Sequence, residues 1–253
     1  MRNIILYLSV LFLHPAETAA QTKPDECLQR LREICRNEQA QMKKSLLEGQ
    51  SWHMSYSLET RIFNPYKETI TPSKTDGEVL ASKNIRYTKT PLVEVFLDDK
   101  DVFTVDKQKK IVTHTSTPHN ALEFVSPYFD VLSDSVFKVY KMAGCLKVKD
   151  QNKTVTRYDI VAIEKQKCPY TKVSFYIEDG AATFYKIYTE LNPLFSKDIR
   201  STLLVIKEQG YRPADAGWYP VRKKLFAGAN LKASYSKYKY KDLITTKTAS
   251  KSK

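Results

Sequence analysis

The chain has 253 residues, of which 42% are hydrophobic, 27% charged and 11% aromatic, and its formal net charge is +13. The 16 tyrosines and 11 phenylalanines exclude a disordered chain, and the 7 glycines exclude a collagen-like one. The remaining possibility is a globular protein, and the length favours one β-rich domain.

The first residues have the features of an export signal. Arg2 is followed by an apolar run over residues 4–13, and Thr18 and Ala20 are small residues at the spacing of a cleavage site. The sequence therefore predicts a signal peptide over residues 1–20. An uncleaved membrane anchor is the alternative, but the run is shorter than the ~20 residues that span a bilayer. We expect a periplasmic or secreted protein of the bacterial envelope.

A helix followed by many strands is expected after the leader. Pro24, two acidic residues and an apolar period of three to four predict a helix that ends at Gly49. From Trp52 the apolar residues alternate with polar ones, which indicates a half-buried strand. Further strands are expected at 78–87, 93–98, 102–106, 111–115, 137–149, 154–164, 172–178, 183–191, 201–208, 218–226 and 231–241. A short helix is expected between residues 118 and 134.

The fold class that follows is mainly β (α+β). Consecutive strands joined by short turns predict one curved antiparallel sheet, an incomplete β barrel with helices covering its concave side. We assign residues 21–245 to this single domain and residues 246–253 to a basic, flexible tail.

The four cysteines all follow the leader, where an oxidising compartment permits disulfides. Cys27 and Cys35 are eight residues apart on one helix, about 12 Å, which is too far for a bond between them. Cys145 and Cys168 flank two neighbouring strands and form one possible disulfide; alternatively, each joins a cysteine of the helix. The sequence has no C-x-x-C pair, so we do not expect a zinc site.

No catalytic motif is present. Nucleophile-elbow, zinc-protease, P-loop and dinucleotide-binding patterns are all missing, so we expect no cofactor and no enzymatic activity. We predict that His53, His114 and His119 lie on the surface. The acidic group at 98–106 lacks the pattern of a calcium loop and is expected to form a solvated turn.

Basic residues are concentrated at the C-terminus. Residues 231–253 contain seven lysines and one aspartate. Lys237, Lys239 and Lys241 alternate with polar and aromatic residues, which is typical of a lysine-lined edge strand. This segment is either a solvated edge or a surface attracted to anionic membranes. We expect no nucleic-acid partner for an exported protein.

Residues 76–116, "DGEVLASKNIRYTKTPLVEVFLDDKDVFTVDKQKKIVTHTS", resemble the periplasmic outer-membrane lipoprotein carrier superfamily (LolA-like and LolB-like proteins). Gly77 precedes the first strand, Pro91 marks the turn, and residues 97–106 correspond to the signature hairpin. Residues 173–188 are similar to a late hairpin of that family. The resemblance implies an open half-barrel that carries lipid or lipoprotein acyl chains.

The apolar face of the first strand suggests where such chains would bind, since burying each methylene group contributes about 0.8 kcal/mol. The residues predicted to bind lipid are Trp52, Met54, Tyr56, Leu58, Ile62, Val95, Leu97, Phe103, Phe175 and Ile177, with Val93 and Val105 as further candidates. Two other readings stay open. One is an interaction or scaffold protein with a filled core and a basic partner-binding edge, and the other is a secreted hydrolase. The sequon at Asn152 also leaves a eukaryotic secreted protein open.

Overall fold

The structure is a computed structural model that describes residues 23–117, 136–150, 152–181, 183–215, 217 and 219–244. The predicted signal peptide, the helix predicted at 118–134 and the basic tail lie outside the described residues. No helix within the described ranges is long and apolar enough to cross a membrane.

Helix α1 spans Pro24–Leu47, as predicted. Pro24 begins the first turn, and Asp25 and Glu26 complement the positive end of the helix dipole there. Gly49, with a φ of +79°, lies just past the end of the helix, in a conformation that glycine adopts without strain. One face of the helix is buried. It consists of Cys27, Leu31, Cys35, Glu38, Met42, Ser45 and Leu46.

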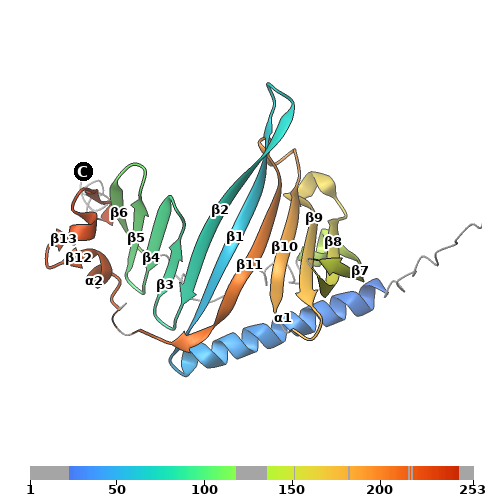
Figure 1. The fold of residues 1–253 in the computed structure, drawn as a ribbon, viewed down its shortest axis with the longest axis horizontal. Coiled ribbons are helices and arrows are strands. Elements are labelled where there is room, and N and C mark those ends of the chain that lie inside the picture. Colours follow the sequence, from blue (N-terminus) through green and yellow to red (C-terminus); the bar gives the residue numbers. More distant parts are fainter. Residues whose placement is uncertain are drawn as a thin grey trace, which may run out of the picture.

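One sheet of twelve strands makes up most of the molecule (Figure 1). Its strands are β1 (Gln50–Asn64), β2 (Thr69–Ala81), β3 (Arg86–Lys89), β4 (Val93–Leu97), β5 (Asp101–Asp106), β6 (Ile111–Ser116), β7 (Tyr140–Asp150), β8 (Lys153–Ala162), β9 (Tyr170–Glu178), β10 (Phe184–Leu191), β11 (Ile199–Pro213) and β14 (Lys239–Asp242). Their order is β14-β6-β5-β4-β3-β2-β1-β11-β10-β9-β8-β7. Every pairing is antiparallel except that of β14 with β6. The predicted open, curved antiparallel sheet is thus confirmed.

Three strand predictions need correction. The run at 78–87 is divided by a turn into β2 and β3, and β2 begins earlier, at Thr69, in a polar segment held by pairing with β1 rather than by burial. The run at 218–226 forms helix α2 (Arg222–Leu225) and the short strand β12 (Phe226–Ala227), because its apolar residues cover the sheet rather than extend it. The run at 231–241 is mostly β13 (Asn230–Leu231), the 3-10 helix η5 (Ala233–Tyr235) and β14.

The sheet is covered on opposite faces in its two halves. Residues paired directly across strands share a face, so the register shows which side each occupies. Helix α1 packs against the face that carries Trp52, Met54 and Phe175, in a core that extends from β1 to β7. Residues 221–240, which we call the C-terminal segment, cover the other face of β3–β6. Phe96 pairs with Phe103 on that face. Among the residues that the structure describes, each half of the sheet therefore has its buried core on a different side.

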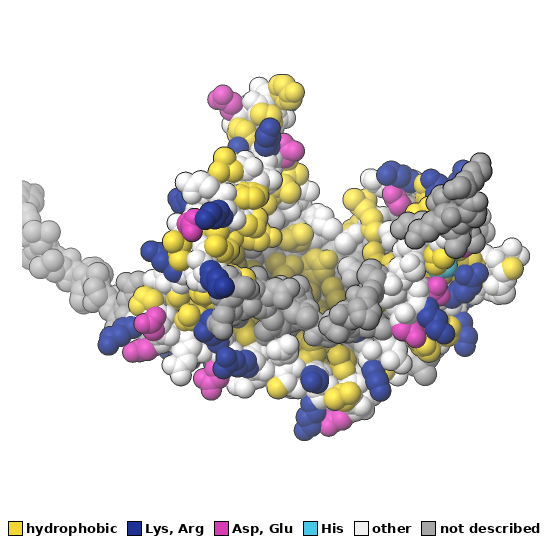
Figure 2. Space-filling model, turned by 180° about the vertical axis from the view of Figure 1, so that it is seen from behind, with side chains coloured by type: hydrophobic (Ala, Val, Ile, Leu, Met, Phe, Trp, Pro, Cys, Tyr) yellow, Lys and Arg dark blue, Asp and Glu magenta, His cyan; other side chains and the backbone are white. Residues whose placement is uncertain are grey.

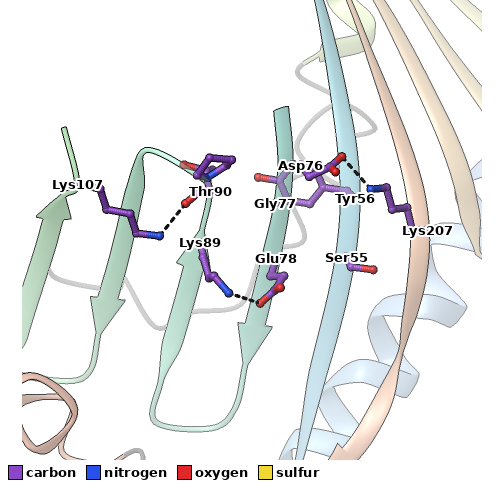
Figure 3. A pocket seen from close by; sticks show the side chains of 10 residues that line it. Ser55, Tyr56, Asp76, Gly77, Glu78, Lys89, Thr90, Lys107 and Lys207 are labelled. Carbon is purple, nitrogen blue, oxygen red and sulfur yellow. Dashed lines mark hydrogen bonds and ion pairs between the residues drawn. The ribbon is translucent and has the colours of Figure 1, made fainter. Parts of the chain in front are cut away.

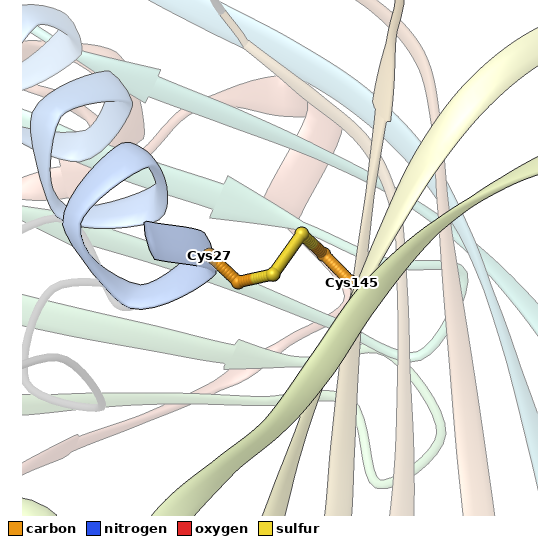
Figure 4. The surroundings of a disulfide bond; sticks show 2 residues. All are labelled: Cys27 and Cys145. Carbon is orange, nitrogen blue, oxygen red and sulfur yellow. A yellow bond between two sulfur atoms is a disulfide. The ribbon is translucent and has the colours of Figure 1, made fainter. Parts of the chain in front are cut away.

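The disulfide joins Cys27 of α1 to Cys145 of β7, with 5.6 Å between their Cα atoms (Figure 4). The proposed pair of Cys145 with Cys168 is therefore wrong. Cys145 faces α1, whereas Cys168 follows the 3-10 helix η3 (Lys165–Lys167), and its thiol donates to the carbonyl of Val139. Cys35 and Cys168 are buried, unbonded thiols, so the expectation that Cys27 and Cys35 do not pair with each other is confirmed.

Candidate functional site

On the α1-side face of the sheet, a band of half-buried apolar side chains begins at the edge of the α1 core, against which Tyr56, Val79 and Leu204 pack, and continues to β5. The register places Leu204 beside Leu58, and Val79 in line with Val95 through Thr88. Leu97 pairs with Val102 on the same face. We call this band the apolar strip. It consists of Tyr56, Leu58, Val79, Val93, Val95, Leu97, Val102 and Leu204.

Four of the ten predicted lipid-binding residues are in the strip: Tyr56, Leu58, Val95 and Leu97. Four others, Trp52, Met54, Phe175 and Ile177, lie on the same face but are buried in the core under α1. A ligand would reach these four side chains only if the helix moved. Ile62 lies farther along β1, where its side chain is exposed.

Phe103 is on the opposite face of the sheet, so its predicted place in the cavity is wrong. Its partners across the sheet are Phe96 and His114, and its side chain is completely buried in the C-terminal core. Val105 lies on that face as well. Apolar residues occur on both faces of β5, so the alternation within this strand could not show which of them face the α1 side.

Val79, Val102 and Leu204 belong to the strip but were not predicted. Leu204 stands in the run of residues 203–206, which is apolar on both faces and gives no period. Val79 and Val102 sit in strands whose neighbours across the sheet were not known from the sequence. Only the register assigns these three residues to the α1 side.

Tyr56 lies across Gly77, its direct partner on β2. A Cβ atom at residue 77 would lie 2.3 Å from Cζ of Tyr56, so only glycine lets the ring rest against this strand. Burial raises the pKa of the Tyr56 hydroxyl. The tyrosine thus adds a large, rigid and neutral wall to the strip.

Figure 2 shows hydrophobic side chains gathered in a hollow between the projecting β1–β2 hairpin and the C-terminal end of the sheet. The opposite face of β1 is polar, with Ser55, Glu59 and Arg61 along the strand. We therefore identify the apolar hollow with the α1-side face.

That polar face holds a separate pocket of about 340 Å³ (Figure 3). Its three lysines are paired with carboxylates: Lys207 with Asp76 at 2.8 Å, Lys89 with Glu78 at 3.5 Å, and Lys107 with Glu94 at 2.8 Å. The hydrogen bond from Lys207 lowers the pKa of Asp76. Each lysine of the pocket is thus neutralised by a carboxylate.

Two buried polar side chains have structural roles beside the core that the C-terminal segment forms on β3–β6. His114 was predicted on the surface but is buried; its Nε2 lies 2.7 Å from Oδ1 of Asp101, and its ring stacks on Phe103. Asp98 is also buried and accepts hydrogen bonds from the backbone N–H groups of Asp101 and Val221. Within the described ranges, no group of His, Cys, Asp or Glu side chains has the geometry to hold a metal ion.

No family model matches the chain, and no curated protein matches it. Several solved structures are similar in outline. An uncharacterized conserved protein from Thermus thermophilus has a TM-score of 0.44 and 8% identity, over 84% of this chain and 99% of its own. A putative outer membrane lipoprotein-sorting protein domain from Vibrio parahaemolyticus has a TM-score of 0.35 and 12% identity, over 79% and 98%. A LolA superfamily protein from Nitrosomonas europaea has a TM-score of 0.31 and 8% identity, over 72% and 96%.

The TM-scores of all three are below 0.5, so these likenesses concern the outline of the fold alone.

Proposed function

We propose that this protein is a non-catalytic component of the bacterial envelope, periplasmic or secreted, that binds the acyl chains of a lipid or lipoprotein on the apolar strip. One observation supports the proposal above the others. Half-buried apolar side chains continue along the α1-side face from the edge of the α1 core, where Leu204, Tyr56 and Val79 pack against it, to β4 and β5. Partly accessible apolar surface that runs across several elements is typical of an interaction site.

The dimensions of the strip suit an extended hydrocarbon chain. The strip crosses six neighbouring strands from β11 to β5, five of which contribute its side chains, and neighbouring strands lie about 4.8 Å apart, so the strip is roughly 24 Å wide. Micromolar affinity corresponds to about 8 kcal/mol, which burial of about ten methylene groups would supply at 0.8 kcal/mol each. No charged partner or bond-making group is required.

The test uses two neighbouring leucines of β11 that differ in the face they occupy. Leu204 lies in the strip beside Leu58, whereas Leu203 pairs with Glu59 on the polar face, and both are half-buried. Leu204→Glu should weaken binding of a fluorescent fatty acid to the purified, delipidated protein at least tenfold, because it places a charge in the apolar site. Leu203→Glu should leave the affinity unchanged.

A second variant tests whether loss of binding results from misfolding. Val95→Glu alters the strip on β4, away from the α1 core, and should weaken binding in the same way while circular dichroism and the unfolding midpoint stay close to wild type. If the wild type binds no fatty acid, phospholipid or acylated peptide, and mass spectrometry finds no copurified lipid, the acyl-binding proposal fails. A scaffold protein would then be the better description.

A further inference from the structure

The β1–β2 hairpin projects beyond the rest of the sheet (Figure 1). Large apolar side chains of this hairpin are exposed. Tyr66, at its turn, is 96% exposed, and Ile62 and Ile70 are also exposed. The turn between β10 and β11 adds Leu194, 71% exposed, and Phe195. The N–H of Phe63 donates to the carbonyl of Asp198 at 2.6 Å, so the two segments are joined. We call Ile62, Tyr66, Ile70, Leu194 and Phe195 the apolar tip.

Neither face of the hairpin end is packed against another layer. Ile62 pairs with Thr71, and the next residue, Phe63, pairs with Ile70, so apolar side chains point to both sides of the ribbon. The turn itself is held by Asn64, whose Oδ1 accepts hydrogen bonds from the N–H groups of Tyr66 and Lys67. The exposure of Tyr66 is therefore built into an ordered turn.

Basic side chains surround the tip. Residues 61–70 and 193–200 contain four basic side chains, Arg61, Lys67, Lys197 and Arg200, against two acidic ones. In the described structure, Lys67 and Lys197 take part in no ion pair. Arg61 is paired with Glu59 at 3.4 Å, and the guanidinium of Arg200 lies 4.1 Å from the centroid of the Phe63 ring. Figure 2 shows hydrophobic, basic and acidic side chains together on this projection.

We propose that the apolar tip docks on an anionic lipid surface, with its aromatic and aliphatic side chains among the head groups and its lysines against the lipid phosphates. Aromatic and aliphatic residues flanked by Lys and Arg are the combination that binds the membrane interface. The charge pattern favours this occupant over a second copy of this chain, since two such basic tips would repel each other. The inference is independent of acyl binding on the strip.

The experiment is flotation of the full-length mature protein with phosphatidylcholine vesicles, with and without added phosphatidylglycerol. The wild type should bind more tightly to the anionic vesicles. Tyr66→Ser combined with Leu194→Ser should weaken that binding at least tenfold. Lys67→Gln and Lys197→Gln should each weaken it about fivefold, and only on anionic vesicles.

A matched control removes exposed apolar side chains elsewhere. Leu47→Ser combined with Leu92→Ser changes two exposed leucines, at the end of α1 and in the β3–β4 turn, and should leave vesicle binding unchanged. Leu204→Glu should also leave it unchanged, which separates this inference from the proposed function. All variants are compared with wild type by circular dichroism.

Three results would overturn the proposal. The first is absence of binding to either kind of vesicle. The second is loss of binding when Lys237, Lys239 and Lys241 of the C-terminal edge are changed to Gln while the tip variants bind normally. The third is a wild-type dimer that the tip variants convert to a monomer without affecting lipid, since the tip would then be an interface between copies.

Discussion

At the scale of the residue, Glu38 is the most unusual side chain of the α1 core. It lies on the helix face that packs against the sheet and is buried, and its Oε2 has no hydrogen-bond partner. Burial raises the pKa of Glu38 to about 7. The carboxylate also raises the pKa of nearby Cys35 and Tyr211, although burial is the larger cause for both.

This pKa predicts how the free energy of unfolding changes with pH. The folded state holds the Glu38 proton more tightly than the unfolded state, so the contribution of Glu38 to stability is greatest below about pH 4.5 and is lost as the pH rises through about 7. Glu38→Gln should remove that loss and be more stable than wild type at pH 8 by up to about 3 kcal/mol. Urea unfolding at several pH values measures this, with the exposed Glu33→Gln as control. Equal pH profiles for wild type and Glu38→Gln would contradict the prediction.

At the scale of the element, the disulfide fixes α1 to the far end of the sheet. Cys27 lies in the first turn of the helix, and Cys145 is in β7, the last strand in the sheet order. The bond closes a loop with a sequence separation of 118 residues. In the chain-entropy model a loop of this size stabilises the folded state by about 4–5 kcal/mol. The bond thus holds the N-terminal end of the helix over the core.

Non-reducing peptide mapping should therefore recover Cys27 and Cys145 in one linked fragment. Cys35 and Cys168 should react with an alkylating reagent only after unfolding, because both thiols are buried. Cys145→Ala should lower the free energy of unfolding by a few kcal/mol, whereas Cys168→Ala should leave the map of the linked fragment intact. A fragment that links Cys145 to Cys168 would show that the helix docks differently.

At the scale of the whole molecule, two cores share one continuous sheet. Leu31 is completely buried in the α1 core, and Phe226 is buried in the core that the C-terminal segment forms on the other face. The strands between them are hydrogen-bonded without interruption from β14 to β7. Loss of either core would therefore weaken the same hydrogen-bonded framework.

We expect the chain to unfold in one transition that responds to both cores. Leu31→Ala and Phe226→Ala should each lower its free energy of unfolding by about 2–5 kcal/mol, as large-to-small core substitutions do. Leu47→Ala, at an exposed position of α1, should change it by less than about 0.5 kcal/mol. Calorimetry with two separate transitions, each sensitive to only one variant, would instead indicate two independent units and contradict the predicted single domain.

The sequence by itself determined those features that depend on local period and turn chemistry. The extent of α1 follows from its apolar face, its first-turn Pro24 and Gly49, and most strands follow from alternation between turn residues. The antiparallel pairing of consecutive strands within residues 50–116 and 140–213 follows from the short connections between them, which cannot support parallel pairing.

Only the tertiary structure decided which face each strand presents and what covers it. Val102, Phe103 and Val105 are apolar on both sides of β5, so the face of Phe103 depends on its register with β4 and β6. The partner of Cys145 depends on where α1 docks, and the polar first half of β2 exists because β1 offers it hydrogen bonds. These are long-range contacts, and a local sequence pattern does not predict them. One more residue in a turn shifts the register and moves every side chain that follows to the opposite face.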